Sequence, residues 1–196
     1  RIIWAKRWQR GWPSSPWQWP YLTVRVALFL REGGLIRSEY SLFSHTVCGL
    51  AEEAIEYYVS VFPQSELKFI SKYGPGEGHV DQAKVNFAQF SLAGMDFVAL
   101  DNGTGGEFSF NEAFSFIVNC SSQEEIDYFW HKLSAVPEAE QCGWLKDKYG
   151  VSWQVVPEGF DDLLQKSSPE ERSRMIQAFL GMKKIDLAAM DRARRG

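Results

Sequence analysis

The chain has 196 residues, 45% of them hydrophobic and 23% charged, a composition typical of a soluble globular protein. Its formal net charge of −4 argues against a nucleic-acid partner. The three cysteines lie far apart without a CxxC pair, which favours reduced thiols, and the longest apolar stretch near the start (VALFL) is too short to cross a bilayer. We therefore expect a cytoplasmic protein with neither a membrane nor a nucleic-acid partner.

Residues 1–42 differ from the rest of the chain. They carry seven Arg or Lys residues against two Glu, and five of the eight tryptophans lie in the first nineteen positions. Prolines interrupt this segment, and its apolar residues follow no helical or alternating period. One interpretation is a basic aromatic arm that binds a membrane surface or a nucleic acid. The interpretation we favour is a disordered or non-native segment, such as an expression scar or translated upstream sequence, and the first methionine, Met95, agrees with it.

Regular patterning begins near residue 50. Residues 50–62 place apolar side chains at helical spacing with glutamates on the other face, and Pro63 stops this helix. Three strands are expected to follow, over residues 66–74, 83–92 and 95–100.

The same order then repeats. A strand is expected over 113–120, followed by a helix over 121–135 that Ser121 or Ser122 can cap. Two short strands joined by a tight turn close this half, around 141–146 and 151–156.

The end of the chain is expected to be helical. Ser168, Pro169 and Glu171 have the spacing of a capping box with proline in the first turn, and a second helix is expected over 182–195. The predicted organisation is an atypical arm (1–42) followed by one α+β domain (43–196), which comprises two modules (about 43–105 and 106–157) and a helical tail (158–196).

Four blocks carry a family resemblance: AEEAIEYYVSVFPQSEL, FNEAFSFIVNCSSQEEIDYFWHKLS, QCGWLKDKYGVSWQVVPE and MKKIDLAAMDRA. They resemble the PhnB-like branch of the vicinal oxygen chelate (glyoxalase/bleomycin resistance/dioxygenase) superfamily, which is often labelled 3-demethylubiquinone-9 3-methyltransferase-like. The resemblance runs from about Gly49 to Gly196. It implies paired βαβββ modules, a pocket in the concave sheet, a homodimer and a bacterial protein.

The resemblance fails at the front of the domain. SLFSHTVCGLAEEA stands where the family has a first strand resembling ITPFLWFDGNAEEA, so we expect an altered first strand. A shifted reading frame upstream of Gly49 would explain both this change and the tryptophan-rich arm.

Metal-using members of the superfamily place a His or Glu on each of several strands, where the side chains converge on a divalent ion. DKYGVSWQ superposes on a superfamily turn resembling DPDGNxxE, so Gln154 stands where the last metal-binding Glu would be, and a neutral amide is a weaker ligand. Ala113 and Ser115 stand where a His is expected, and His45 lies one position from the ligand slot, on the opposite strand face. We predict no preformed metal site and no cofactor; the alternative is a divalent metal held by Gln154 and unrecognised ligands.

FVALDNGTGGE superficially matches the strand, acid and glycine loop that binds adenosylmethionine. That loop requires a helix directly after it within a Rossmann unit, whereas FSFNEAFSFIVNC has a strand pattern. We therefore interpret the loop as the linker between the modules.

Gln154 is the residue on which the site prediction depends. In VSWQVV, Trp153 lies on a face suited to packing against a helix, while Ser152 and Gln154 lie on the face that lines the cup. A buried amide must be hydrogen-bonded, so Gln154 is expected to meet either protein neighbours or a polar ligand. The predicted pocket residues are Gln154 and Ser152 together with three that the resemblance suggests: Trp144, Glu107 and Asn111. No catalytic residue is predicted.

The leading hypothesis is a PhnB-like protein that binds an unknown small molecule in this pocket without a preformed catalytic metal. Two enzymatic alternatives stay open: a metal-dependent lyase or dioxygenase-type enzyme of the same superfamily, and the methyltransferase named by the family label. The sequence alone leaves open whether the protein is an enzyme.

Overall fold

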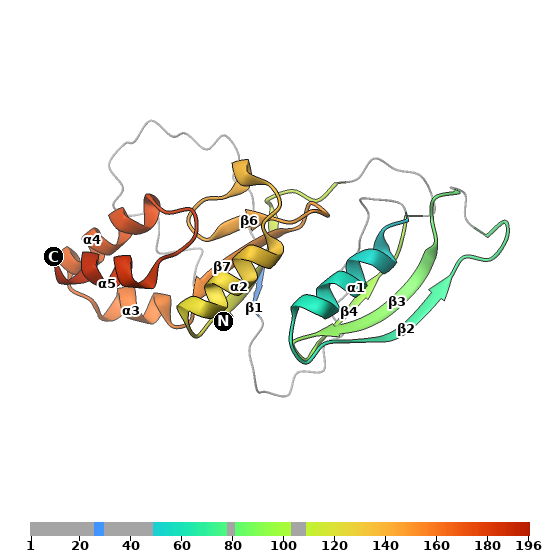
Figure 1. The fold of residues 1–196 in the computed structure, drawn as a ribbon, viewed down its shortest axis with the longest axis horizontal. Coiled ribbons are helices and arrows are strands. Elements are labelled where there is room, and N and C mark those ends of the chain that lie inside the picture. The colour runs from blue at the N-terminus through green and yellow to red at the C-terminus, as the bar shows by residue number, and fades with distance from the viewer. Residues whose placement is uncertain (1–25, 30–48, 78–80, 103–108) are drawn as a thin grey trace.

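The computed structural model describes residues 49–77, 81–102 and 109–196, and the backbone of residues 26–29. The described chain forms two small sheets flanked by helices, followed by a helical tail (Figure 1). This arrangement confirms the predicted α+β class with a helical C-terminal tail. The expected first strand of the first module, upstream of Gly49, lies outside the described residues.

The first half consists of one helix and an antiparallel three-stranded sheet in the order β2-β3-β4. Its elements are α1 (Ala51–Val61), β2 (Glu66–Lys72), β3 (Val85–Leu92) and β4 (Met95–Ala99). α1 ends just before Pro63, as the sequence predicts, because proline cannot continue the helical hydrogen bonds. It begins just after Gly49, whose φ of +92° and close approach to the Gln82 carbonyl leave no room for a Cβ.

The second half is a four-stranded sheet, here called sheet A, in the order β1-β5-β7-β6. Its elements are β1 (Val26–Phe29), β5 (Phe114–Cys120), α2 (Gln123–Leu133), the single turn η1 (Pro137–Ala139), β6 (Trp144–Lys146) and β7 (Ser152–Pro157). β5 and β7 are parallel, and the chain between them, which includes α2 and β6, is long enough for the crossover that a parallel pair needs; β6 and β7 form an antiparallel hairpin. β1 lies parallel to β5 at the edge, an element within residues 1–42 that the sequence does not predict.

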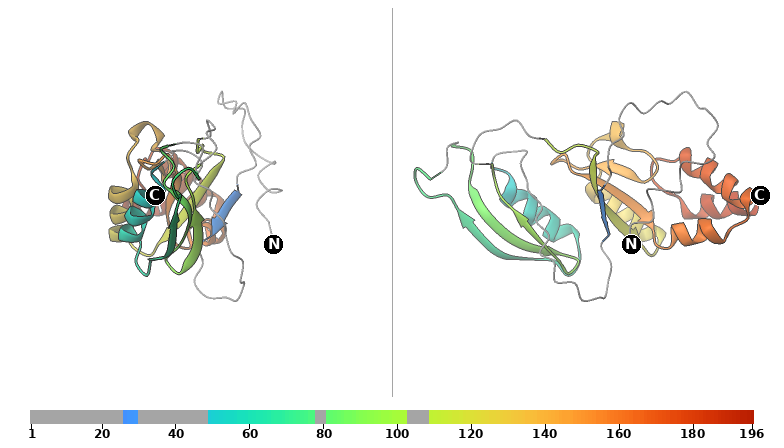
Figure 2. Two further views of the ribbon diagram at one scale, coloured as in Figure 1. Left: turned by 90° about the vertical axis from the view of Figure 1, so that its right-hand side faces the viewer. Right: turned by 180° about the vertical axis from the view of Figure 1, so that it is seen from behind.

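The two helices α1 and α2 cover the same side of the sheets. The left view of Figure 2 shows both helices on one side of the strands, and among the described elements no helix covers the opposite side. We call the uncovered side of sheet A its helix-free face. The alternation of buried and less buried residues along β7 matches this arrangement, because Trp153 and Val155 are buried beneath α2.

The tail consists of α3 (Phe160–Lys166), α4 (Pro169–Leu180) and α5 (Leu187–Arg195). α4 has the predicted capping box between Ser168 and Glu171. α5 begins at Leu187 rather than near Met182, because the carbonyl groups of Met182 and Lys183 accept backbone hydrogen bonds from Cys142 and Gly143 instead of helical ones. α3, a short helix after Gly159, lies within the predicted helical tail (158–196), although the sequence analysis gave it no bounds of its own.

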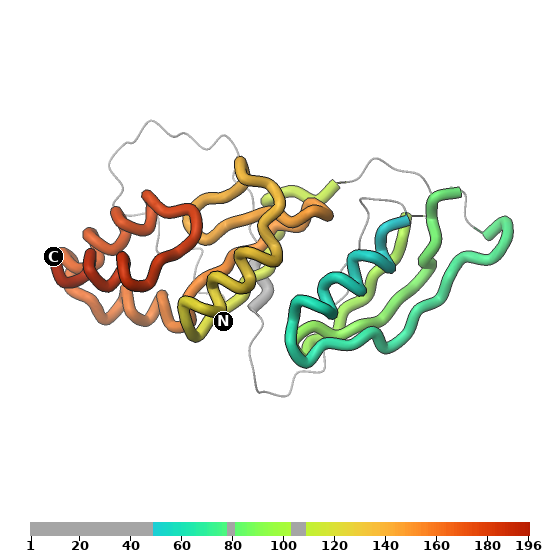
Figure 3. Tube along the Cα trace, viewed as in Figure 1, coloured from blue at the N-terminus to red at the C-terminus, as the bar shows by residue number. Residues whose placement is uncertain are grey.

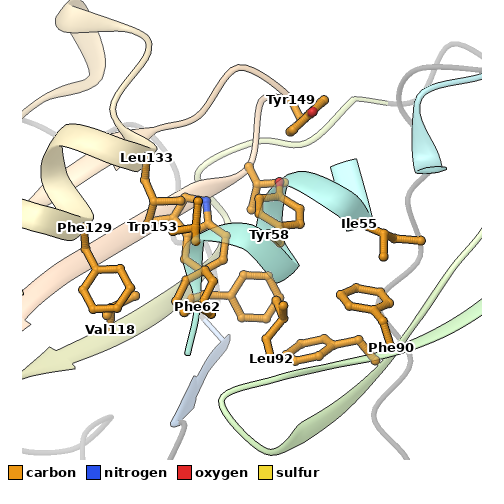
Figure 4. Packing of buried hydrophobic residues seen from close by; sticks show 14 of the residues in the cluster. Ile55, Tyr58, Phe62, Phe90, Leu92, Val118, Phe129, Leu133, Tyr149 and Trp153 are labelled. Atoms are coloured by element: carbon orange, nitrogen blue, oxygen red, sulfur yellow. The ribbon is translucent and has the colours of Figure 1, made fainter. Parts of the chain in front are cut away.

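One hydrophobic core joins the two halves. The rings of Tyr58 and Phe62 on α1 lie 5.6 and 5.3 Å from the ring of Trp153 on β7, measured between centroids (Figure 4). Because helix and strand come from different halves, neither half buries its apolar side chains alone. A second, smaller cluster around Met175, Ile185 and Met190 holds the tail together.

Candidate functional site

The helix-free face of sheet A presents three neighbouring polar side chains, here called the polar cluster: Ser115, Ser152 and Gln154. Gln154 donates a hydrogen bond from Nε2 to Ser115 Oγ at 2.8 Å, across the β5–β7 pair. Ser115 and Ser152 are buried, with 4% and 2% of their surface exposed, and Gln154 is half-buried. Gln154 therefore has the orientation that the sequence predicts, and its amide group is hydrogen-bonded to a protein side chain, that of Ser115.

Ser152 is the unusual member of the polar cluster. Its Oγ is buried and has no hydrogen-bond partner in the described structure. A hydroxyl removed from water without a partner costs about 1–3 kcal/mol, so such groups are rare in folded proteins and call for a specific explanation, such as strain or a bound water, ion or ligand.

The strand β6 borders the polar cluster. In the β6–β7 register Trp144 lies opposite Gln154, and Lys146 lies opposite Ser152. The ammonium group of Lys146 pairs with the carboxylate of Glu112, and this hydrogen bond lowers the pKa of Glu112. The border therefore carries one balanced ion pair and adds no net charge.

The structure brings together three of the five predicted pocket residues: Gln154, Ser152 and Trp144 lie side by side on the helix-free face. Asn111 is exposed in the segment before β5, where its Oδ1 accepts a hydrogen bond from the backbone N–H of Ala113 at 3.0 Å. Glu107 lies outside the described residues. Sequence reasoning considered Ser115 only as the replacement of an expected histidine, although its position in the alternating pattern of β5 already places it on this face.

The groups that the polar cluster could offer to a metal ion are two hydroxyls and an amide, all of them neutral. Divalent metals in proteins are held by carboxylate, imidazole or thiolate groups, so these residues do not fit a catalytic metal centre. Within the described ranges, no three His, Cys, Asp or Glu side chains are grouped to hold an ion. His45, which the sequence analysis considered as a ligand, lies outside these ranges, as does His79.

A buried carboxylate fixes the β6–β7 turn, which leads into the strand that carries Ser152 and Gln154. Asp147 is 1% exposed, and its Oδ2 accepts hydrogen bonds from the Tyr58 hydroxyl and the Trp153 indole, both at 2.7 Å. Its Oδ1 accepts from the backbone N–H groups of Tyr149 and Val151 at 2.9 and 3.0 Å. Burial raises the pKa of Asp147, and these hydrogen bonds oppose the rise. Asp147 therefore ties α1, the β6–β7 turn and Trp153 together.

A second buried carboxylate, Asp101, belongs to the stretch that resembles a cofactor loop. It is 1% exposed and accepts hydrogen bonds from the backbone N–H groups of Ala51, Lys84 and Val85, at 3.1, 2.9 and 2.8 Å. The bond from Ala51 satisfies the first turn of α1, where a negative charge is also favoured by the helix dipole. Asp101 thus serves as an internal anchor of the first half.

Comparison with known proteins identifies the family. The family model described as 3-demethylubiquinone-9 3-methyltransferase matches residues 42–156, more than half of the chain. The chain belongs to this family, in its PhnB-like branch. This family membership confirms the resemblance found in the sequence. The whole tail (158–196) and all but the last residue of the arm (1–42) lie outside the matched segment.

One solved structure agrees with the family. A Bacillus cereus protein titled a putative 3-demethylubiquinone-9 3-methyltransferase, PhnB protein, is 37% identical, with a TM-score of 0.52, over 61% of this chain and 99% of its own. A Pseudomonas aeruginosa protein is 18% identical with a TM-score of 0.49, over 62% of this chain and 98% of its own. A search of curated proteins found no match. Among the described residues, no helix is both long and apolar enough to cross a membrane.

Proposed function

We propose that this PhnB-like protein binds a small polar molecule on the helix-free face of sheet A through the polar cluster, without a preformed catalytic metal. The observation that carries the proposal is the buried Ser152 hydroxyl, which lacks a hydrogen-bond partner in the described structure. A ligand oxygen placed there would recover the hydrogen bond that folding leaves unmade.

The chemistry of the face favours a neutral ligand. The polar cluster offers hydroxyl and amide groups, and Lys146 is already neutralised by Glu112. Ile117 lies opposite Gln154 in the β5–β7 register and adds an apolar surface beside the polar groups. A small molecule that combines a carbonyl or hydroxyl oxygen with an apolar part matches this surface.

Methyl transfer, the activity in the family description, is the weaker candidate. A Rossmann-type cofactor site needs a parallel strand–helix–strand unit and a free acidic group at the strand end. Here β3 and β4 are antiparallel, and Asp101 is buried and engaged by three backbone N–H groups. A metal-dependent lyase or dioxygenase would need carboxylate or imidazole donors, which the polar cluster does not supply. The expected homodimer and the cytoplasmic location stay predictions.

A thermal-shift screen of the full chain against a library of small neutral metabolites, with and without Mg²⁺, Mn²⁺ and Zn²⁺, tests the proposal. A ligand that binds the folded state raises the melting temperature by mass action. We expect at least one compound to raise the melting temperature without a metal ion. This rise should be lost in Ser152→Ala and kept in Asn119→Ala, a control substitution at an exposed position of β5.

Three results would contradict the proposal. The first is that every hit depends on a divalent ion, and the second is that the purified protein holds stoichiometric metal. The third is that Ser152→Ala and Asn119→Ala respond alike to every hit. Titration calorimetry with adenosylmethionine is expected to give no heat of binding, and a clear binding isotherm would restore the methyltransferase.

A further inference from the structure

The helical tail borders an open cavity that is separate from the polar cluster. Its volume is about 370 Å³, and it lies where the C-terminal ends of β5 and β7 meet α3, α4 and α5. Figure 3 shows this part of the chain at the end of the molecule remote from β2 and β3. Small-molecule sites occupy roughly 300–1,000 Å³, and a dry cavity of about 150 Å³ already accepts benzene. This tail cavity is therefore large enough for a short alkyl chain or one aromatic ring.

The interior of the tail cavity is apolar and adaptable. Its lining includes Phe160, Leu163, Met175, Leu187 and Met190. Met175 and Met190 are buried, with 0% and 4% of their surface exposed. Unbranched thioether side chains adjust their shape to a ligand at little cost, which suits a site that receives flexible apolar groups.

The mouth of the tail cavity carries an excess of negative charge. Glu158 and Asp191 line it and are exposed, and Arg194 is the basic residue beside them. Arg194 is engaged by Glu171, with 3.5 Å between Nε and Oε1, and Asp191 pairs with Arg195. Glu158 has no ion-pair partner among the described residues. The unbalanced charge at the mouth is therefore that of one carboxylate.

We propose that the tail cavity binds a small amphipathic amine, with its apolar part among Met175, Met190 and Leu163 and its ammonium group beside Glu158. Charge complementarity selects the amine over an acid of the same length, and the apolar lining selects it over a fully polar amine. The proposal is independent of the polar cluster, because no residue of that cluster lines the tail cavity.

The four methionines of the chain provide the test. In full-length protein labelled with ¹³C at the methionine methyl groups, octylamine, octanol and octanoate are titrated below their micelle concentrations. We expect octylamine to shift the signals of Met175 and Met190 in a saturable way and to leave Met95, on β4 in the first half, unchanged. Octanol is expected to bind more weakly and octanoate more weakly still.

Two matched variants separate charge recognition from apolar burial. Glu158→Gln is expected to weaken octylamine binding about two- to fivefold, the range of an exposed ion pair, and to leave octanol binding unchanged. Asp162→Asn, an exposed position of α3 outside the lining, is expected to bind octylamine like the wild type. The proposal is overturned if Met175 and Met190 do not shift, if all methionines shift together, if octanoate binds as tightly as octylamine, or if the two variants behave alike.

Discussion

Replacing Asp147 with asparagine keeps the shape of the side chain but removes one of its two acceptor oxygens. The carboxylate accepts two side-chain donors on Oδ2 and two backbone donors on Oδ1. If the amide oxygen of asparagine faces the backbone, its NH₂ group meets the donors of Tyr58 and Trp153. The Tyr58 hydroxyl can turn and accept, because a phenol both donates and accepts, but the indole N–H of Trp153 can only donate.

The expected cost follows from these four bonds. The variant leaves at least one buried donor without an acceptor and weakens a second bond to a charged group, and each such change costs about 1–3 kcal/mol. We expect Asp147→Asn to lower the free energy of unfolding by roughly 2–4 kcal/mol, a large share of the 5–15 kcal/mol typical of a domain. Tyr58→Phe removes a donor and leaves the carboxylate with three partners, so it is expected to cost less.

Urea unfolding followed by tryptophan fluorescence measures both variants. We expect a lower midpoint for Asp147→Asn with an unchanged slope, since the slope reports the surface exposed on unfolding. A loss below about 1 kcal/mol, or a greater loss for Tyr58→Phe than for Asp147→Asn, would refute the role assigned to Asp147.

Three further predictions follow from buried groups. Burial raises the pKa of Asp147 above its unfolded value. The contribution of Asp147 to the free energy of unfolding is therefore greatest at acid pH and is lost as pH rises through the raised pKa. In urea unfolding between pH 3 and 7, the loss of unfolding free energy caused by Asp147→Asn should therefore shrink as pH rises. A loss that grows with pH would mean that the hydrogen bonds to Asp147 affect its pKa more than burial does. Burial raises the pKa of Cys120 to about 12, so iodoacetamide should modify the half-exposed Cys142 before Cys120. Peptide mass spectrometry measures the two rates, and equal rates would contradict the buried position of Cys120. Asp101→Ala removes the acceptor of three backbone N–H groups and should cost roughly 3 kcal/mol or more in urea unfolding, and a loss within 1 kcal/mol would show that water replaces the carboxylate.

The elements that the sequence predicts are those specified by neighbouring residues. α1 follows from apolar spacing and Pro63, and α4 follows from a capping box that lies within four residues. The orientation of Gln154 follows from the two-residue period of a strand and needs no knowledge of the rest of the fold.

The features that sequence reasoning misses depend on residues far apart in the chain. Ser115 bonds to Gln154 across 39 positions, and the Tyr58 hydroxyl bonds to Asp147 across 89. No local pattern marks either pair, because an isolated Asp in a Lys-Asp-Lys-Tyr-Gly stretch has the composition of an ordinary turn. β1 was missed for the same reason: its only described partner is β5, far along the chain.

The backbone bonds from Cys142 and Gly143 to Met182 and Lys183 attach the tail to the segment directly before β6. Gly143 itself permits this contact, because a Cβ there would lie 2.9 Å from the Val155 carbonyl and 3.0 Å from Ile185. A protein shortened to residues 42–156, the family-matched segment, would thus leave the N–H groups of Cys142 and Gly143 next to β6 unpaired. It would also remove the tail side chains that pack against Val156. The segment that precedes α5 thus completes the hydrogen bonding at the start of the β6–β7 hairpin, a part that the helices of the tail do not supply.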